Sequence, residues 1–137
     1  MGTRTEVYVD TSALIAFLDR SDTYHPLFSE LFADPPRLVT TPLVIAEGHG
    51  WFLRRFDSTR ALQFLAFVDA LRPLRVLPMS SSELQAAGDW LRRFKDQPLT
   101  LADAVGFVVM RDRRIQSCWS TDRHLGLSGV PLVIHER

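Results

Sequence analysis

The 137-residue sequence contains one cysteine and one lysine, and it lacks any long apolar run. A single cysteine, Cys118, excludes an internal disulfide and is consistent with a reducing compartment. No apolar run reaches the roughly 18 residues that a membrane-spanning helix requires. The N-terminal segment MGTRTEVYVD has no apolar stretch followed by a small-residue cleavage site, so no secretion signal is evident. We therefore expect a cytoplasmic protein that does not insert into a membrane.

The sequence also lacks an excess of charge of either sign. Its 16 basic and 16 acidic residues give a formal net charge of zero, so composition alone does not indicate a nucleic-acid-binding protein. Lys95 is the only lysine, and several arginines occur in clusters: Arg54, Arg55 and Arg60; Arg92 and Arg93; Arg111, Arg113 and Arg114. Arginine suits bidentate phosphate contacts better than lysine does. For any one cluster, however, a solvated helix face is the more common explanation.

Length and composition predict one domain over residues 1–137, with 46% apolar and 23% charged residues as in globular proteins. We find no internal repeat, low-complexity tract or linker. Apolar periodicity, prolines and capping residues predict strands that alternate with helices. The expected strands are 6–9, 37–41, 75–78, 116–121 and 131–136, and the expected helices are 11–19, 23–33, 42–56, 58–71, 80–94 and 101–114.

This alternation predicts the α/β class, because crossover connections produce a mainly parallel sheet. We expect a three-layer sandwich with a sheet of four to five strands and helices on both faces. In such sheets ligands bind beyond the carboxyl ends of the strands, where the strand order reverses. Asp10 directly follows the first expected strand, and Asp122 follows the fourth. Both carboxylates are therefore expected at the edge of the sheet where ligands bind.

Four acidic residues allow an ordinary structural explanation when each is taken alone. Asp10 could cap the helix that follows it, and Asp122 could cap a turn. Thr100 and Asp103 have the spacing of a capping box that opens an apolar helix. Glu47 lies inside the apolar run VIAEG, which favours a buried or half-buried position.

Taken together, these explanations are less satisfactory. Two acids at strand ends and two near the starts of helices would converge on one rim of the sheet. Carboxylates at close range repel one another and raise one another's pKa values. A divalent cation would make such a cluster tolerable, and Mg²⁺ is a hard ion that takes carboxylates and water. Paired metals in nuclease sites activate a water molecule and stabilise the leaving oxygen of a phosphodiester.

Four segments carry a resemblance to a known family: VYVDTSALIAF, VIAE, DQPLTLADAVGFVVM and STDRHL, in this order and spacing. They resemble the motifs of the PIN-domain family, and most of all the VapC-type toxins of bacterial toxin–antitoxin modules. The likeness covers essentially the whole chain. It implies a PIN-like fold and an endoribonuclease that requires Mg²⁺ or Mn²⁺. It also implies a homodimer that acts on RNA and is held inactive by a cognate antitoxin.

By position, the resemblance assigns the catalytic and metal-binding site to Asp10, Glu47, Asp103 and Asp122. Ancillary positions are the hydroxyl residues Thr11, Ser12 and Thr100 and the acid Asp96, which is also an ordinary turn residue. Weaker candidates for RNA contact are Arg92, Arg93, Arg123 and His124. Leu125 stands where close relatives often have Phe, which is a packing change that leaves the acid untouched. The four histidines show no metal-ligand spacing such as His-x-x-x-His.

Three other functions share parts of this pattern. A receiver domain needs a lysine at a late strand end, but Lys95 lies in or after a helix. A haloacid-dehalogenase-like phosphatase needs Asp-x-Asp after the first strand, where this sequence has Asp10-Thr11-Ser12. The remaining alternative is a PIN fold that binds RNA or a protein with little or no cleavage. The four intact acids argue against it, and a metal-dependent cleavage assay separates the two.

Overall fold

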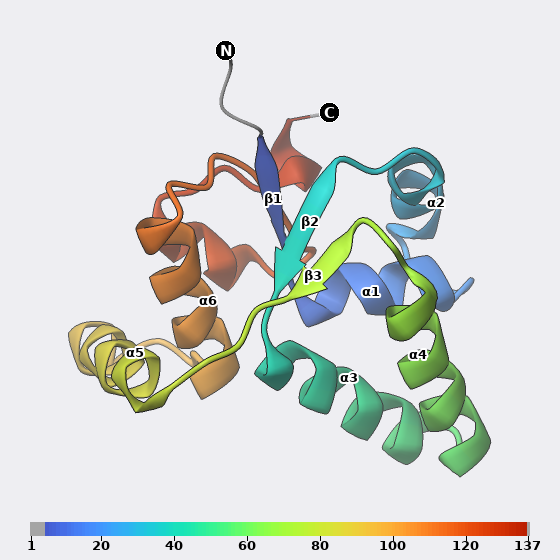
Figure 1. The fold of residues 1–137 in the computed structure, drawn as a ribbon, viewed down its shortest axis with the longest axis horizontal. Helices are drawn as coiled ribbons and strands as arrows, with labels where there is room; N and C mark the ends of the chain where they lie inside the picture. The colour runs from blue at the N-terminus through green and yellow to red at the C-terminus, as the bar shows by residue number, and fades with distance from the viewer. Residues whose placement is uncertain (1–4, 137) are drawn as a thin grey trace.

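A computed structural model describes residues 5–136 of the chain. Figure 1 shows strands that alternate with helices, as the sequence predicts. The elements are β1 (Glu6–Val9), α1 (Thr11–Leu18), α2 (His25–Ala33), β2 (Arg37–Thr40), α3 (Pro42–Arg55), α4 (Ser58–Ala70), β3 (Leu74–Val76), α5 (Ser81–Arg93), α6 (Leu101–Asp112), β4 (Cys118–Trp119), and the 3₁₀ helices η1 (Arg123–Ser128) and η2 (Val133–His135).

The four strands form one sheet in the order β3-β2-β1-β4. Each of the pairings within residues 5–136 is parallel, and Tyr8 of the central strand β1 lies opposite Val39 of β2 and Cys118 of β4. The chain passes from β1 to β2 to β3 and then returns to the other side of β1. The strand order therefore reverses between β1 and β4, which is where ligands bind in sheets of this kind.

Helices cover both faces of the sheet, which confirms the three-layer α/β sandwich (Figure 1). On one side α5 and α6 pack together, with Trp90 of α5 against the edge of Phe107 of α6. On the other side lie α1 to α4, where Phe28 and Phe32 of α2 pack against Trp119 of β4. One apolar core joins the layers.

Helix α6 is the most deeply buried helix of the fold, with nine consecutive buried residues from Ala102 to Met110. A helix that is apolar all round belongs inside a protein. Its close approach to β1 depends on Gly106, since a Cβ atom there would lie 2.7 Å from the Tyr8 hydroxyl oxygen. This contact brings the first turn of α6 close to the end of β1. Within residues 5–136, no helix has both the length and the apolar character needed to cross a membrane.

The strand predicted at 131–136 is wrong. Only Leu132 pairs with the sheet, through an isolated parallel bridge to Cys118, and Val133–His135 forms η2. The strand β4 is also shorter than the predicted 116–121, because pairing is limited to Cys118 and Trp119. A strand of two residues offers no ladder on which a neighbouring strand can extend, so the apolar segment packs into the core as a turn instead.

We expect Gly48→Ala to lower the free energy of unfolding by about 1–3 kcal/mol, the usual cost of overpacking a core. A Cβ atom at Gly48 would lie 2.2 Å from the ring of the buried Phe64. Gly88→Ala on α5 is the matched control, because its Cβ atom would meet only the flexible side chain of Arg92 at 3.5 Å. Alanine should there stabilise the helix by up to about 1 kcal/mol. Urea denaturation that gave both variants the same sign would contradict the packing of α3 against α4.

Candidate active site

The four acids predicted from the sequence lie on the segments that gather at the carboxyl ends of β1 and β4. Asp10 follows β1 and caps α1, and Asp122 follows β4 and caps η1. Asp103 lies in the first turn of α6, and Glu47 lies in the second turn of α3. Asp10, Glu47 and Asp122 therefore sit at or near a junction where a strand passes into a helix, whereas Asp103 opens α6 after the loop that follows α5.

Asp10 is the most enclosed of the four, with only 5% of its surface exposed. Its Oδ2 atom accepts hydrogen bonds from the hydroxyls of Ser12 at 2.8 Å and Ser120 at 3.1 Å. Burial raises the pKa of Asp10 from 3.8 to about 6, and the negative charge of Asp103 adds to the increase. The two serine hydroxyls act in the opposite direction, since they stabilise the carboxylate.

Asp103 and Thr100 form the capping box that the sequence predicts. The Thr100 amide donates to Asp103 Oδ2 at 3.0 Å, and the Asp103 amide donates to Thr100 Oγ1 at 3.1 Å. Burial raises the pKa of Asp103 despite the hydrogen bond from the Thr100 amide, and the charge of Asp122 raises it further. Asp103 thus completes the capping box of α6, and its negative charge is destabilised by burial and by the charge of Asp122.

Glu47 is half-buried and is linked to α1 by Thr11. The Thr11 hydroxyl lies 3.2 Å from Glu47 Oε1 and 3.3 Å from the carbonyl oxygen of Val44, so it can donate to either. Burial raises the pKa of Glu47, and repulsion by Asp103 and Asp122 contributes. The predicted ancillary residue Thr11 therefore orients one of the acids.

Asp122 is more open than Asp10 and Asp103, and its side chain is 39% exposed. Its Oδ1 atom accepts a hydrogen bond from the His124 amide at 3.0 Å and lies 2.9 Å from His124 Nδ1. The Asp122 amide donates to the hydroxyl of Ser120 at 2.9 Å. Through Ser120, the backbone of one acid is joined to the carboxylate of another.

Ser120 is a site residue that the sequence analysis did not identify. It is fully buried and bonds to Asp10, and its hydroxyl lies 3.1 Å from that of Ser12. Ser12 also accepts a hydrogen bond from the Thr121 amide at 2.9 Å. The available signal was a hydroxyl residue at the end of an expected strand, two positions before an acid, in the segment STD.

The charges of these acids act on one another, with Asp103 acting on both Asp10 and Glu47. Within the described part of the chain, no three His, Cys, Asp or Glu side chains are already arranged as a metal-binding group. The donor set nevertheless fits a hard cation, because Mg²⁺ commonly uses one or two carboxylates and keeps several water ligands. The two acids buried most deeply, Asp10 and Asp103, are the ones that would hold it.

The remaining predicted residues lie outside this cluster or at its margin. Asp96 is exposed in the turn after α5, and within residues 5–136 no hydrogen bond or ion pair joins it to the four acids. Arg92 forms an exposed ion pair with Asp89, and Arg93 covers the ring of Trp90. Arg123 is exposed at the start of η1, beside Asp122.

The model of the PIN domain family matches residues 7–126. This chain belongs to the PIN domain family. The resemblance drawn from the four sequence segments is therefore confirmed. The match spans all four acids, so the PIN domain and the acid cluster described above are the same part of the chain.

Individual proteins are also similar to this chain. Ribonuclease VapC26 of Mycobacterium tuberculosis is 27% identical over 116 residues, 84% of this chain and 85% of that protein. The crystal structure of VapC20 from the same organism, described as a sarcin–ricin loop cleaving toxin, is 26% identical with a TM-score of 0.82, and the match covers 90% of this chain and 95% of that one. A chain of a toxin–antitoxin complex from Klebsiella pneumoniae is 17% identical with a TM-score of 0.59, and the match covers 88% of this chain and 89% of that one. At this level of identity the similarity shows the fold alone.

We expect Asp10→Asn to stabilise the metal-free protein at pH 7.5 and to have little effect at pH 4. Because the pKa of Asp10 rises from 3.8 to about 6 on folding, stability falls as the pH rises between these values. Removing the charge should restore about 2–3 kcal/mol at most above pH 6. Asparagine keeps an oxygen that can accept from Ser12.

Urea denaturation in EDTA at the two pH values measures this difference. The matched control is Asp69→Asn on the exposed surface of α4, which should be neutral at both. If both variants behaved alike, the Asp10 carboxylate would not be the destabilising charge.

Proposed function

We propose that this PIN-domain chain is a divalent-metal-dependent endoribonuclease and the toxin of a type II toxin–antitoxin pair. The observation that carries the proposal is the cluster of enclosed acids at the point where the strand order reverses. Asp10, Glu47 and Asp103 all have pKa values raised by burial, and each is further raised by a neighbouring acid. Such a cluster is stabilised by a cation and has no evident use in packing.

The similarity to Ribonuclease VapC26 and to the toxin VapC20 supports RNA as the substrate. When bound, Mg²⁺ or Mn²⁺ would polarise a phosphate oxygen and lower the pKa of an attacking water. The chain would hold the ion through Asp10 and Asp103, with Asp122 as a further ligand at the open side. Glu47 is suited to accept a proton from the water, because a raised pKa makes a carboxylate a better general base.

Hydroxyl residues position these acids. Ser12 and Ser120 both donate to Oδ2 of the Asp10 carboxylate, and Thr11 orients Glu47. Thr100 fixes Asp103 through the capping box. These contacts keep the carboxylates oriented before substrate arrives, which is how electrostatic stabilisation of a transition state avoids reorganisation.

The proposed partners are a cognate antitoxin and a second copy of the chain. The fold shared with the Klebsiella pneumoniae toxin–antitoxin complex supports the antitoxin. Light scattering of the purified protein tests the homodimer, and a monomer at micromolar concentration would remove it. Co-purification with the product of a neighbouring small reading frame, together with loss of cleavage in the complex, tests the antitoxin.

The purified protein should cleave a sarcin–ricin loop hairpin RNA in Mn²⁺ and should not cleave it in EDTA. Asp10→Asn and Asp103→Asn should each lower the cleavage rate by at least about 10²-fold, since each removes a preorganised charge from the reacting centre. Ser120→Ala should lower it by about 10- to 100-fold, the usual cost of losing an outer-shell contact.

Asp69→Asn is the surface control for cleavage and should be fully active. Total cellular RNA serves as a second substrate, with cleavage sites mapped by sequencing the RNA ends. RNA binding without cleavage of either substrate in Mn²⁺ would favour the alternative of a binding module.

Binding of Mn²⁺ should stabilise the wild-type fold by about 2.7 kcal/mol at a hundred times its dissociation constant. Asp10→Asn should lose most of that increase while its melting temperature in EDTA at neutral pH is equal to or above that of the wild type. Differential scanning calorimetry with and without Mn²⁺ measures both. A full metal-induced shift in Asp10→Asn would remove Asp10 from the metal site, because asparagine caps a helix about as well as aspartate does.

A further inference from the structure

A second concave surface lies at the opposite end of α6 from Asp103. It is a hollow of about 570 Å³ between the C-terminal halves of α5 and α6 and the loop that follows η1. We call it the arginine pocket and define it by Trp90, Arg93, Met110, Arg111, Arg114 and Val130. Neither the acid cluster nor the proposed catalytic residues contribute to it.

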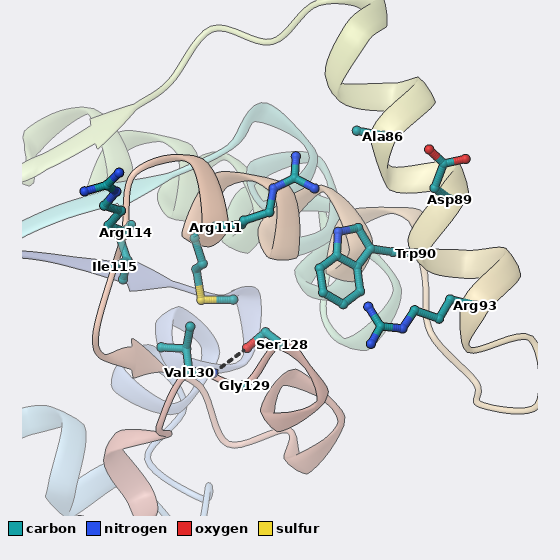
Figure 2. Close-up of a pocket in the computed structure, with 11 residues that line it drawn as sticks. Ala86, Asp89, Trp90, Arg93, Arg111, Arg114, Ile115, Ser128, Gly129 and Val130 are labelled. Carbon is teal, nitrogen blue, oxygen red and sulfur yellow. Dashed lines mark hydrogen bonds between the residues drawn. The ribbon is translucent and has the colours of Figure 1, made fainter.

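The arginine pocket has an apolar floor and a basic rim. Met110 and Ile115 lie beneath it and are almost fully buried. Figure 2 shows Trp90 and Arg93 of α5 at one end and Arg114 at the other, with Arg111 between them. Three guanidinium groups are therefore spread along the pocket. That arrangement suits an extended ligand with repeated negative charges better than a single compact anion.

Trp90 forms a fixed aromatic wall at one end of the pocket. Its ring packs edge-to-face with Phe107, with ring centroids 5.2 Å apart, and lies nearly parallel to the ring of Phe94, with centroids 5.9 Å apart. The guanidinium of Arg93 lies over both rings, 5.3 Å from the centre of Trp90 and 5.4 Å from that of Phe94. Arginine and aromatic groups in this combination bind nucleic-acid strands by stacking and charge.

The positive charge of the pocket is largely uncompensated. Within residues 5–136, Arg93 and Arg114 form no ion pair, and Arg111 pairs only with its exposed neighbour Asp112 at 3.0 Å. Exposed pairs of that kind contribute little. Asp89 on the rim is itself engaged by Arg92. The pocket can therefore accept an anion without first breaking a strong contact.

The backbone of Arg114 gives an independent reason to assign a role to this surface. Its φ angle is +53°, and among residues 5–136 it is the only residue other than glycine with a positive φ. Glycine and asparagine adopt this left-handed conformation at helix ends far more readily than arginine. Glycine or asparagine would end α6 at least as well, so the backbone conformation alone does not call for an arginine at position 114.

We propose that the arginine pocket binds the RNA strand next to the bond that is cut, with phosphates on Arg93, Arg111 and Arg114. A base would lie against Trp90 and the apolar floor. The inference rests on the proposed ribonuclease function. Helix α6 connects the two sites, because eight residues from Asp103 to Arg111 span about 12 Å along a helix. One RNA strand a few nucleotides long can therefore reach from the acids to the pocket.

The test measures binding of a labelled sarcin–ricin loop hairpin RNA in EDTA, where cleavage is suppressed. The triple variant Arg93→Gln/Arg111→Gln/Arg114→Gln should bind more weakly. The slope of log affinity against log salt should become less steep by about 2, because each lost single-strand phosphate contact contributes about 0.7. Cleavage in Mn²⁺ should show a raised KM with kcat little changed, because the acids are intact. Arg72→Gln beside β3, at the opposite edge of the sheet, is the single-charge control and should match the wild type.

Arg114→Asn separates a role in binding from a role in folding. Asparagine tolerates the left-handed backbone, so the melting temperature should not fall. Affinity for the hairpin should nevertheless fall several-fold, and the salt slope should decrease by about 0.7. A fall in affinity that occurred only with a fall in melting temperature would overturn the inference.

The other outcomes are equally distinct. If the wild type cleaves RNA and the triple variant keeps its affinity and salt slope, the pocket inference fails while the proposed function stands. If the triple variant loses binding of polyglutamate but keeps RNA binding, the pocket serves an acidic protein partner. If it changes the oligomeric state in light scattering, the pocket is a contact between copies. Either result would overturn the inference. Absence of metal-dependent cleavage by the wild type would instead overturn the proposed function.

Discussion

The buried carboxylate of Asp10 is the constraint on which the rest of the site depends. A charge removed from water is costly unless it is bonded or compensated. Here the compensation within the described residues comes from Ser12 and Ser120, and it leaves the pKa at about 6. Asp10 is held in this position because it ends β1, the strand that pairs on both sides in the centre of the sheet. The register of β2, β1 and β4 therefore determines where the charge lies.

The second acid, Asp103, reaches the same place by a different route. It lies on α6, which is buried over nine consecutive residues and approaches β1 closely through the contact between Gly106 and Tyr8. The apolar burial that holds α6 against the sheet works against the repulsion between Asp103 and its neighbours. The same helix thus supplies apolar residues that stabilise the core and an acid whose charge destabilises the site. A fold of this kind tolerates a strained site because the packing around it is extensive.

The two ends of α6 have opposite chemical character. The first turn carries Asp103 in a capping box, while Arg111 in the last turn and Arg114 just beyond it lie on the rim of the arginine pocket. A rigid helix fixes the separation between these groups in a way that a loop could not. In our proposals, the acids perform the chemistry while the arginines position the RNA strand. Because both groups include residues on or next to α6, the distance between them stays constant.

The sequence by itself determined the features that depend on neighbouring residues. The alternation of strands and helices, the caps at Asp10 and Thr100 and the placement of acids at strand ends are local patterns, and the structure has them. Only the tertiary structure decided that residues 131–136 form a bridge and a turn, that Ser120 bonds to Asp10, and that Arg93, Arg111 and Arg114 share one pocket. These features depend on strand order and on packing between segments far apart in the chain, which no local spacing encodes.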